Sequence, residues 1–268
     1  MKTIDKIVHH WLRLPYTLSV RHKRLKKVFG TTYVLIHGLA DTGDLWKPLL
    51  DKLPKDANYF VVDLLGHGNS AHPDGDDIYS AQRQAHNLLK TYLKTGMSGP
   101  VVLIGHSFGG LVASEFARGY RGIVKQLILV SPPIYRDESQ DKKDQLRQEK
   151  ILRDVYRQFL KNPDLLMHGY VLVNKLRLMG FSKIKFNKEN YIGIIGTLRS
   201  GIIDQQAGKR LARSTVPTTI IYGRLDPLLV PSNFTALKGQ NSNINIVPLV
   251  TGHAMRDVTI KAILKILL

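Results

Sequence analysis

Residues 101–110 of the chain are VVLIGHSFGG, a short apolar run followed by a serine that stands between glycines. The run VVLI has the length of a buried strand, and GGLVASEFARG (109–119) has the pattern of a helix that ends at a glycine. A Gly-x-Ser-x-Gly motif between a strand and a helix is typical of a tight turn that exposes the serine hydroxyl. Gly105 and Gly109 permit this turn because they let the two backbones pass closely. The context therefore predicts that Ser107 is a nucleophile.

Apolar runs of strand length alternate with helical patterns along most of the chain. A half-buried strand is indicated at 14–22, where apolar and polar residues alternate, and the continuous runs are 31–38, 58–68, 100–107, 124–133, 218–227 and 243–250. Helical patterns stand near 45–53, 80–95 and 255–268. Because such alternation is typical of a parallel sheet covered on both faces, we predict an α/β fold.

The alternation stops after the fourth long apolar run. Residues 134–214 are rich in charges and helical patterns, such as DKKDQLRQEKILRDVYRQFL, and the strand pattern then resumes. We therefore predict a core built from 1–133 and 215–268, with a helical insertion, 134–214, between two strands of one sheet. Within the core, 1–14 form an added N-terminal amphipathic helix whose apolar stripe includes Ile4, Ile7 and Trp11.

Composition limits the classes of protein to consider. The chain has 268 residues, enough for one large domain, and it has no cysteine, which excludes disulfides, thiolate zinc sites and a cysteine nucleophile. We expect no membrane-spanning segment, because no stretch approaches about 20 apolar residues. The N-terminal stretch has no uninterrupted apolar core and no small-residue cleavage site, so we expect a cytoplasmic protein.

The formal net charge of +18 is unusual, and basic residues concentrate in RHKRLKK (21–27). Such a charge is compatible with nucleic acid, an anionic membrane surface or acidic substrates. We find no nucleic-acid-binding motif and expect no nucleic-acid partner. Because the basic cluster follows an apolar helical stripe, we also consider a weak contact between this N-terminal region and an anionic membrane surface.

A serine nucleophile needs a base to accept its proton and a carboxylate to orient that base. Asp226 follows the strand-like run TTIIY, and His253 follows NINIVPLV. In an open parallel sheet the groups that follow the strands gather at one edge, and the order Ser, Asp, His is the one expected for this type of turn. We predict that Ser107, Asp226 and His253 form a catalytic triad.

Alternatives exist for the base and the acid. The histidines beside glycines at strand ends are expected to bond backbone near the site; they are His37, His67 and His106. Asp63 also follows a strand, and Asp204 lies in the insertion, so both stay open as the acid. For the oxyanion hole we expect the backbone N–H groups of Phe108, at the start of the helix, and Leu39, in the loop after VLIHG.

The segments HGLADTGDLW, DLLGHGNS, GHSFGG, GRLDP and GHAM together resemble the α/β-hydrolase superfamily, in its lidded esterase- and lipase-like branch. The resemblance extends from about residue 15 to the end of the chain. It implies a mostly parallel sheet of about eight strands with helices on both faces, and a helical cap over Ser107 formed by 134–214. It implies no cofactor and no metal.

The leading hypothesis is a serine carboxylesterase that cleaves a small-molecule ester, with a small to medium acyl or alcohol group, through an acyl-enzyme. A second hypothesis keeps the triad but acts on an acidic substrate, by hydrolysis of a carbon–carbon bond or a thioester, or by elimination. A third is a ligand receptor of the same fold with little turnover. Ser107 in place of an elbow aspartate disfavours dehalogenase and epoxide hydrolase chemistry.

Overall fold

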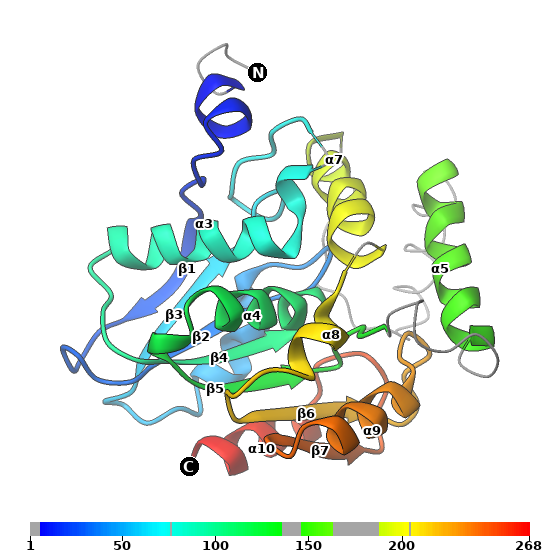
Figure 1. Ribbon diagram of the computed structural model, residues 1–268. Helices are drawn as coiled ribbons and strands as arrows, with labels where there is room; N and C mark the ends of the chain where they lie inside the picture. The colour runs from blue at the N-terminus through cyan, green and yellow to red at the C-terminus, as the bar shows by residue number, and fades with distance from the viewer. Residues whose placement is uncertain (1–5, 76, 136–145, 163–187, 204) are drawn as a thin grey trace.

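The computed structural model describes residues 6–75, 77–135, 146–162, 188–203 and 205–268. A seven-stranded sheet with the order β1-β3-β2-β4-β5-β6-β7 runs through these residues (Figure 1). The strands are β1 (Ser19–Arg24), β2 (Thr32–Ile36), β3 (Asn58–Asp63), β4 (Val101–His106), β5 (Val124–Val130), β6 (Thr218–Gly223) and β7 (Ile244–Leu249). β1 pairs with β3 in antiparallel fashion, and the other five pairs are parallel.

Six of the seven strand-like stretches each contain one strand, whereas the stretch 14–22 only overlaps β1, which begins at Ser19 and extends to Arg24. The predicted α/β-hydrolase fold with a mostly parallel sheet is confirmed. The resemblance implies about eight strands, whereas the described residues contain seven. β4 lies in the middle of the sheet and is buried along its whole length. A strand buried on both faces needs a continuous apolar run, which is why VVLI does not alternate.

Helices connect the strands and cover both faces of the sheet. The α-helices are α2 (Lys47–Leu50), α3 (Ala81–Lys94), α4 (Phe108–Gly119), α5 (Leu146–Lys161), α7 (Lys188–Gly196), α8 (Ala207–Leu211), α9 (Pro231–Gln240) and α10 (Asp257–Leu267). Tighter or wider helical turns are η1 (Lys6–Trp11), η2 (Gly43–Trp46), η3 (Asp77–Tyr79), η4 (Arg121–Ile123) and η5 (Thr197–Ile203). One apolar cluster joins the sheet to α3, α4 and α9, and a second joins its other face to α2 and α10.

Between β5 and β6 the described residues form the helical elements α5, α7, η5 and α8, and stretches such as 131–135 and 212–217 are not helical. Figure 1 shows α5 and α7 beyond the carboxyl ends of the parallel strands. Residues 136–145, 163–187 and 204 of the predicted cap lie outside the described residues, among them the stretch YVLVNKLRLMG. The limits of the cap, 134 and 214, therefore stay a prediction.

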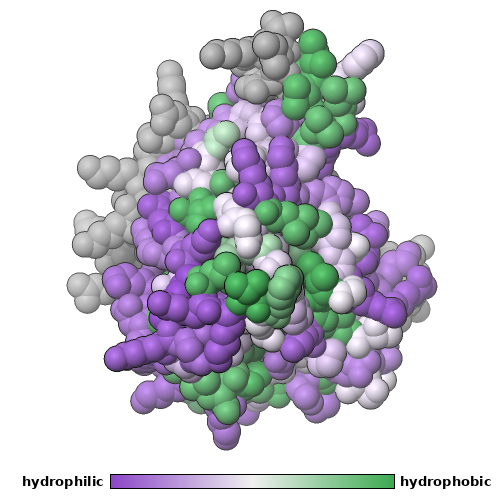
Figure 2. Space-filling view, turned by 90° about the vertical axis from the view of Figure 1, so that its left-hand side faces the viewer, coloured by the Kyte–Doolittle hydropathy of each residue, from purple (hydrophilic) through white to green (hydrophobic). Residues whose placement is uncertain are grey.

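The N-terminal helical turn η1 projects from the body of the molecule (Figure 1). Its apolar stripe is not buried, since Ile7 is 48%, Trp11 85% and Leu12 57% exposed. The hydrophobic side chains at this end form a patch at the top of the space-filling view (Figure 2). Among the described helices, none is both long and apolar enough to cross a lipid bilayer.

Candidate active site

Ser107 occupies the sharp turn between β4 and α4. Its backbone has φ 52° and ψ −122°, a conformation that non-glycine residues seldom adopt. The Ser107 N–H donates to the Val130 carbonyl at 2.8 Å, which ties the turn to β5. Gly109 packs so closely on the end of β2 that an added Cβ would overlap the carbonyl oxygens of Ile36 and His37. A strained backbone such as that of Ser107 costs on the order of 1–3 kcal/mol, and residues of this kind are concentrated at functional sites.

Asp226 and His253 meet at the carboxyl ends of β6 and β7. An Asp226 carboxylate oxygen lies 2.6 Å from Nδ1 of His253, and the two side chains are 0% and 2% exposed. The other carboxylate oxygen accepts the Leu228 N–H at 3.0 Å. Because the Nδ1 proton is directed at the carboxylate, Nε2 is the nitrogen of His253 that can accept a proton.

His106, the residue before Ser107, connects β4 to the loop that carries His253. Its Nε2 donates to the His253 carbonyl at 2.9 Å, and the two rings lie 5.1 Å apart between centroids. Burial, with the adjacent His253, lowers the pKa of His106 to about 3, so the ring is neutral at physiological pH. The elbow and the base are thus joined through one hydrogen bond.

Two further histidines also bond backbone, as the sequence predicts. His67 Nδ1 lies 3.1 Å from the Leu65 carbonyl, and His37 Nδ1 lies 2.8 Å from the Gly38 carbonyl. The second nitrogen of His37 accepts the Leu64 N–H at 2.9 Å. Burial lowers the pKa of His37 to about 4, which favours the neutral ring that this bonding pattern requires.

The loop with Leu39 passes directly beside the serine. A Cβ built on Gly38 would lie 3.0 Å from the Cβ of Ser107. Phe108 is the first residue of α4, and the first N–H groups of a helix have no partner within it. Among the described residues, the backbone N–H groups of Leu39 and Phe108 donate to no other residue. Both are therefore available to an anion.

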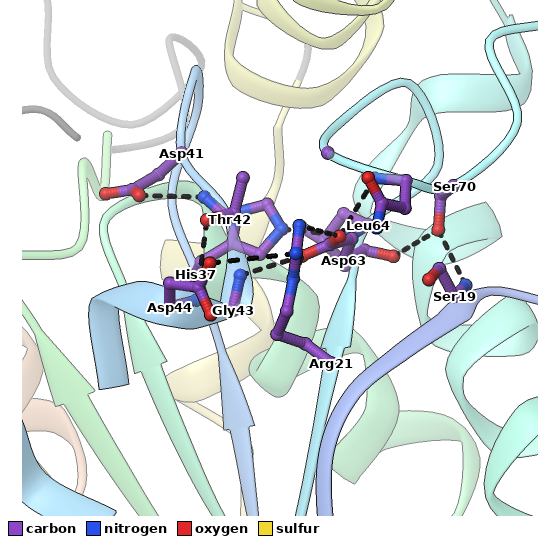
Figure 3. Close-up of polar contacts among 12 residues, drawn as sticks. Ser19, Arg21, His37, Asp41, Thr42, Gly43, Asp44, Asp63, Leu64 and Ser70 are labelled. Atoms are coloured by element: carbon purple, nitrogen blue, oxygen red, sulfur yellow. Dashed lines mark hydrogen bonds and ion pairs between the residues drawn. The ribbon is translucent and has the colours of Figure 1, made fainter. Parts of the chain in front are cut away.

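Asp63, the alternative acid, has other partners. Figure 3 shows its carboxylate between Arg21 and the N–H of Gly43, with Nη2 of Arg21 at 2.6 Å and the Gly43 nitrogen at 2.8 Å. The Asn69 N–H donates to the same group at 2.9 Å. Burial alone raises the pKa of Asp63, but these donors outweigh it and hold the pKa below its usual value. Asp63 thus joins β1, the 37–43 loop and the 66–70 turn. Asp204 lies outside the described residues.

Parts of the insertion lie directly over the elbow and the acid. Gly201 of η5 packs on the ring of Phe108, and Gly193 of α7 packs on Gly66. Tyr156 of α5 is buried near Asp226; burial and the charge of that carboxylate raise the pKa of Tyr156 to about 12. The sequence does not single out Tyr156 or Arg21, because their partners are 70 and 42 residues away (226 − 156; 63 − 21).

The described residues contain no group of three or more His, Asp or Glu side chains that could hold a metal ion. The reactive groups at this edge of the sheet are a hydroxyl, an imidazole and a carboxylate, each from the end of a different strand. A strained elbow serine and a buried carboxylate–imidazole pair over a parallel sheet define the class of protein, an α/β hydrolase.

Comparison with known proteins leads to the same class. A family model described as alpha/beta hydrolase fold matches residues 33–255, and the chain belongs to this family. Lipase 3 of Moraxella sp. is 26% identical over 235 residues, which are 86% of this chain and 72% of the lipase. The pimeloyl-[acyl-carrier protein] methyl ester esterase of Vibrio atlanticus is 34% identical over 102 residues, 38% of this chain and 36% of the esterase. A solved hydrolase from Oleispira antarctica superimposes with a TM-score of 0.72 at 15% identity, covering 91% of this chain and 93% of that one.

Proposed function

We propose that the chain is a serine carboxylesterase, with Ser107 as nucleophile, His253 as general base and Asp226 as the carboxylate that orients the base. The observation that carries the proposal is the 2.6 Å hydrogen bond between Asp226 and His253, at the sheet edge where the elbow holds Ser107. The similarity to Lipase 3 and to a methyl ester esterase supports a carboxylic ester as the bond that is cleaved.

The reaction follows from these groups in two halves. Nε2 of His253 takes the Ser107 proton as the hydroxyl oxygen attacks the ester carbonyl, and the protonated ring then gives this proton to the leaving alcohol. Water enters, loses a proton to the same nitrogen and attacks the acyl-enzyme, which releases the acid and restores Ser107. Asp226 keeps the ring in the required tautomer and stabilises its charged form. The Leu39 and Phe108 N–H groups stabilise the oxyanion in each half, where one donor is worth about 100- to 1,000-fold in turnover.

The insertion forms the substrate pocket in this proposal. Support comes from the apolar side chains that its described parts bury toward the core, among them Tyr156, Leu198 and Ile202. A pocket with such a lining favours a neutral ester with a small to medium acyl or alcohol group. We place the cap at 134–214; the contact of η5 with Phe108 and that of α7 with Gly66 support this.

Hydrolysis of p-nitrophenyl butyrate by Ser107→Ala tests the proposal. We expect turnover to fall by roughly a million-fold, as for other triad serines. Ser114→Ala is the matched control, because Ser114 is a buried serine of α4 whose hydroxyl donates to the Gly110 carbonyl at 2.9 Å. Equal rates for wild type and Ser107→Ala in homogeneous protein would overturn the proposal, as would failure of a fluorophosphonate probe to label Ser107.

A substrate panel separates the ester from the other reactions of a serine triad. We expect kcat/KM to be highest for neutral p-nitrophenyl esters and to pass through a maximum along a C2–C12 acyl series. Anionic thioesters and vinylogous keto acids are the competing substrates. A higher kcat/KM for either would keep the triad but replace the ester hypothesis.

We propose further that the enzyme is cytoplasmic and that η1 makes weak contact with an anionic membrane surface. The exposed side chains of Ile7, Trp11 and Leu12 support this contact, together with the charge of +18. Much of RHKRLKK is bonded within the molecule, since Arg21 bonds Asp63 and Lys27 lies within hydrogen-bond distance of Asp56. The attraction must therefore come from the basic surface as a whole.

Co-sedimentation with vesicles containing phosphatidylglycerol tests the membrane contact. Trp11→Ala is expected to weaken binding by about tenfold, because an exposed aromatic side chain contributes much of an interfacial helix's affinity. Binding that is unaffected by anionic lipid, salt or Trp11→Ala would remove this proposal and leave the catalytic one untouched.

A further inference from the structure

A cavity lies between the C-terminal half of α4 and the segment 206–216. Its volume is about 390 Å³. α4 contributes Ser114, Ala117 and Arg118 to its wall, and Arg121 of η4 adds to the same side. The opposite wall is α8 with the residues that lead into β6. Figure 2 views the molecule from the side on which α4 ends, where hydrophilic side chains form much of the surface.

Five cationic side chains line this cavity: Arg118, Arg121, Lys209, Arg210 and Arg213. Glu115 of α4, which is 5% exposed, pairs with two of them, Arg118 at 3.0 Å and Arg210. One buried carboxylate therefore orients two guanidinium groups from opposite walls. Lys209 has a further partner of its own, so the count is made on the four arginines, which keep a net charge of +3 (4 − 1) after this carboxylate.

The remaining lining suits a bound molecule rather than bulk solvent. Ala117, Leu211 and Val216 are buried and form an apolar floor. Ser214 and Thr215 bring hydroxyl groups to the wall beside the arginines. A cavity of a few hundred Å³ with an apolar floor and convergent polar groups has the dimensions of a small-molecule site.

We propose that this cavity binds a small molecule that carries two or more phosphate groups. Guanidinium groups present planar pairs of N–H donors that match phosphate oxygens, and hydroxyl groups add further donors. The net charge of +3 on the arginines is balanced by two phosphate groups, which together carry about −3 to −4 near pH 7, whereas a dicarboxylate carries only −2. The same group can come from a free phosphorylated metabolite or from a phospholipid headgroup, and the experiment below distinguishes them.

The site is separate from the proposed catalytic centre. Within α4, Ser114 is 7 residues and Arg118 is 11 residues along the chain from Ser107. At 1.5 Å per residue these separations correspond to about 10–17 Å along the helix. The proposal therefore does not rest on the esterase assignment, and its test measures binding without turnover.

Calorimetric titration of the full chain with pyrophosphate at low salt tests the proposal. Arg121→Ser/Arg213→Ser removes two exposed cavity cations, and Lys238→Ser/Lys261→Ser removes two exposed cations from α9 and α10. The two double variants have the same net charge. We expect the cavity variant to bind pyrophosphate at least about tenfold more weakly than wild type, and the control to stay within about twofold.

Two further arms identify the source and the class of the ligand. Vesicles containing cardiolipin, a lipid with two phosphate groups, replace pyrophosphate in one arm, and succinate, a dicarboxylate, replaces it in the other. Cavity-dependent binding of pyrophosphate supports a free phosphorylated ligand, and cavity-dependent binding of vesicles alone supports a lipid headgroup. The proposal is overturned if neither probe binds, if both double variants weaken binding equally, or if succinate binds as tightly as pyrophosphate.

Discussion

The two ends of α4 differ in burial, charge and backbone geometry. At the amino end Ser107 is 9% exposed, its φ is positive, and the neighbouring His106 and His253 are buried in hydrogen bonds. At the carboxyl end Arg118 and Arg121 are exposed beside a cationic cavity. The amino end depends on close contacts at defined positions. At the carboxyl end, the proposed binding depends mainly on the number of positive charges around the cavity. Single substitutions there should therefore affect the protein's stability far less.

Of the substitutions near the amino end of α4 described below, Asp226→Asn should reduce turnover the most. The amide cannot accept the Nδ1 proton as the carboxylate does, so we expect turnover of p-nitrophenyl butyrate to fall by about 10⁴-fold while the fold is kept. Asp257→Asn, at an aspartate whose side chain is 82% exposed, is the control and should retain wild-type turnover. Comparable turnover in the two variants would mean that Asp226 does not orient the base.

Arg21→Met and Arg213→Met remove two arginines in different surroundings. Arg21 bonds Asp63, which also holds the 37–43 loop beside Ser107, whereas Arg213 lines the cavity. Asp63 is 0% exposed, so loss of the Arg21 guanidinium leaves a buried carboxylate with backbone donors alone. We expect the free energy of unfolding in urea to fall by about 3 kcal/mol. Arg213→Met removes an exposed cation and should change it by less than about 0.5 kcal/mol. If both variants lose a similar amount of free energy of unfolding, the two ends of α4 do not differ in their tolerance of substitution.

Gly109 and Gly119 lie near the two ends of α4 and differ in the space around them. An added Cβ at Gly109 would overlap backbone, whereas at Gly119 nothing lies within 4 Å of it. We expect Gly109→Ala to destabilise the protein by about 1–3 kcal/mol, since the backbone must move to make room. Gly119→Ala should be neutral or stabilising by up to about 1 kcal/mol. Thermal unfolding measures both, and an equal loss at the two positions would argue against the close packing of the elbow on β2.

His67, whose ring lies 5.4 Å from that of His37 between centroids, should make the stability of the protein depend on pH. Burial lowers the pKa of His67 to about 3, from an ordinary value of 6.5. The unfolded chain binds this proton below pH 6.5 and the folded chain does not, so stability is full above pH 6.5 and is lost as the pH falls toward 3. His67→Phe should reduce the slope between pH 6 and 4 by about 1.4 kcal/mol per pH unit. Arg121→Ser, at a group that stays charged, should leave the slope unchanged, and a slope unaffected by His67→Phe would refute this account.

The fold was predictable because its signal is local. A buried parallel strand needs a continuous apolar run, and a helix needs one apolar face, so β4 and α4 are evident from residues 101–119 alone. The backbone hydrogen bonds of His37, His67 and His106 were likewise indicated by their places beside glycines at strand ends. Part of the helix predicted at 1–14 is present as η1, at Lys6–Trp11, but nothing in the pattern shows that Trp11 would stand exposed.

The remaining features depend on contacts between distant parts of the chain. Within RHKRLKK, the sequence shows six basic residues that look equally suited to a surface, yet Arg21 folds onto Asp63 while Lys27 stays exposed. Asp63 and Asp226 both follow strands, and their different partners became clear only from the packing of β1 and β7 at opposite edges of the sheet.

By itself, the sequence determined the α/β class, the elbow at Ser107 and the order of the groups that follow the strands, since each depends on neighbouring residues or on a fixed rule of parallel sheets. Tertiary structure decided which carboxylate meets His253, where the insertion lies over the elbow, and that five cations from α4, η4 and the 206–216 segment line one cavity. Electrostatic and hydrogen-bond partners depend on distances in space over a few ångströms, and separation along the chain does not encode them.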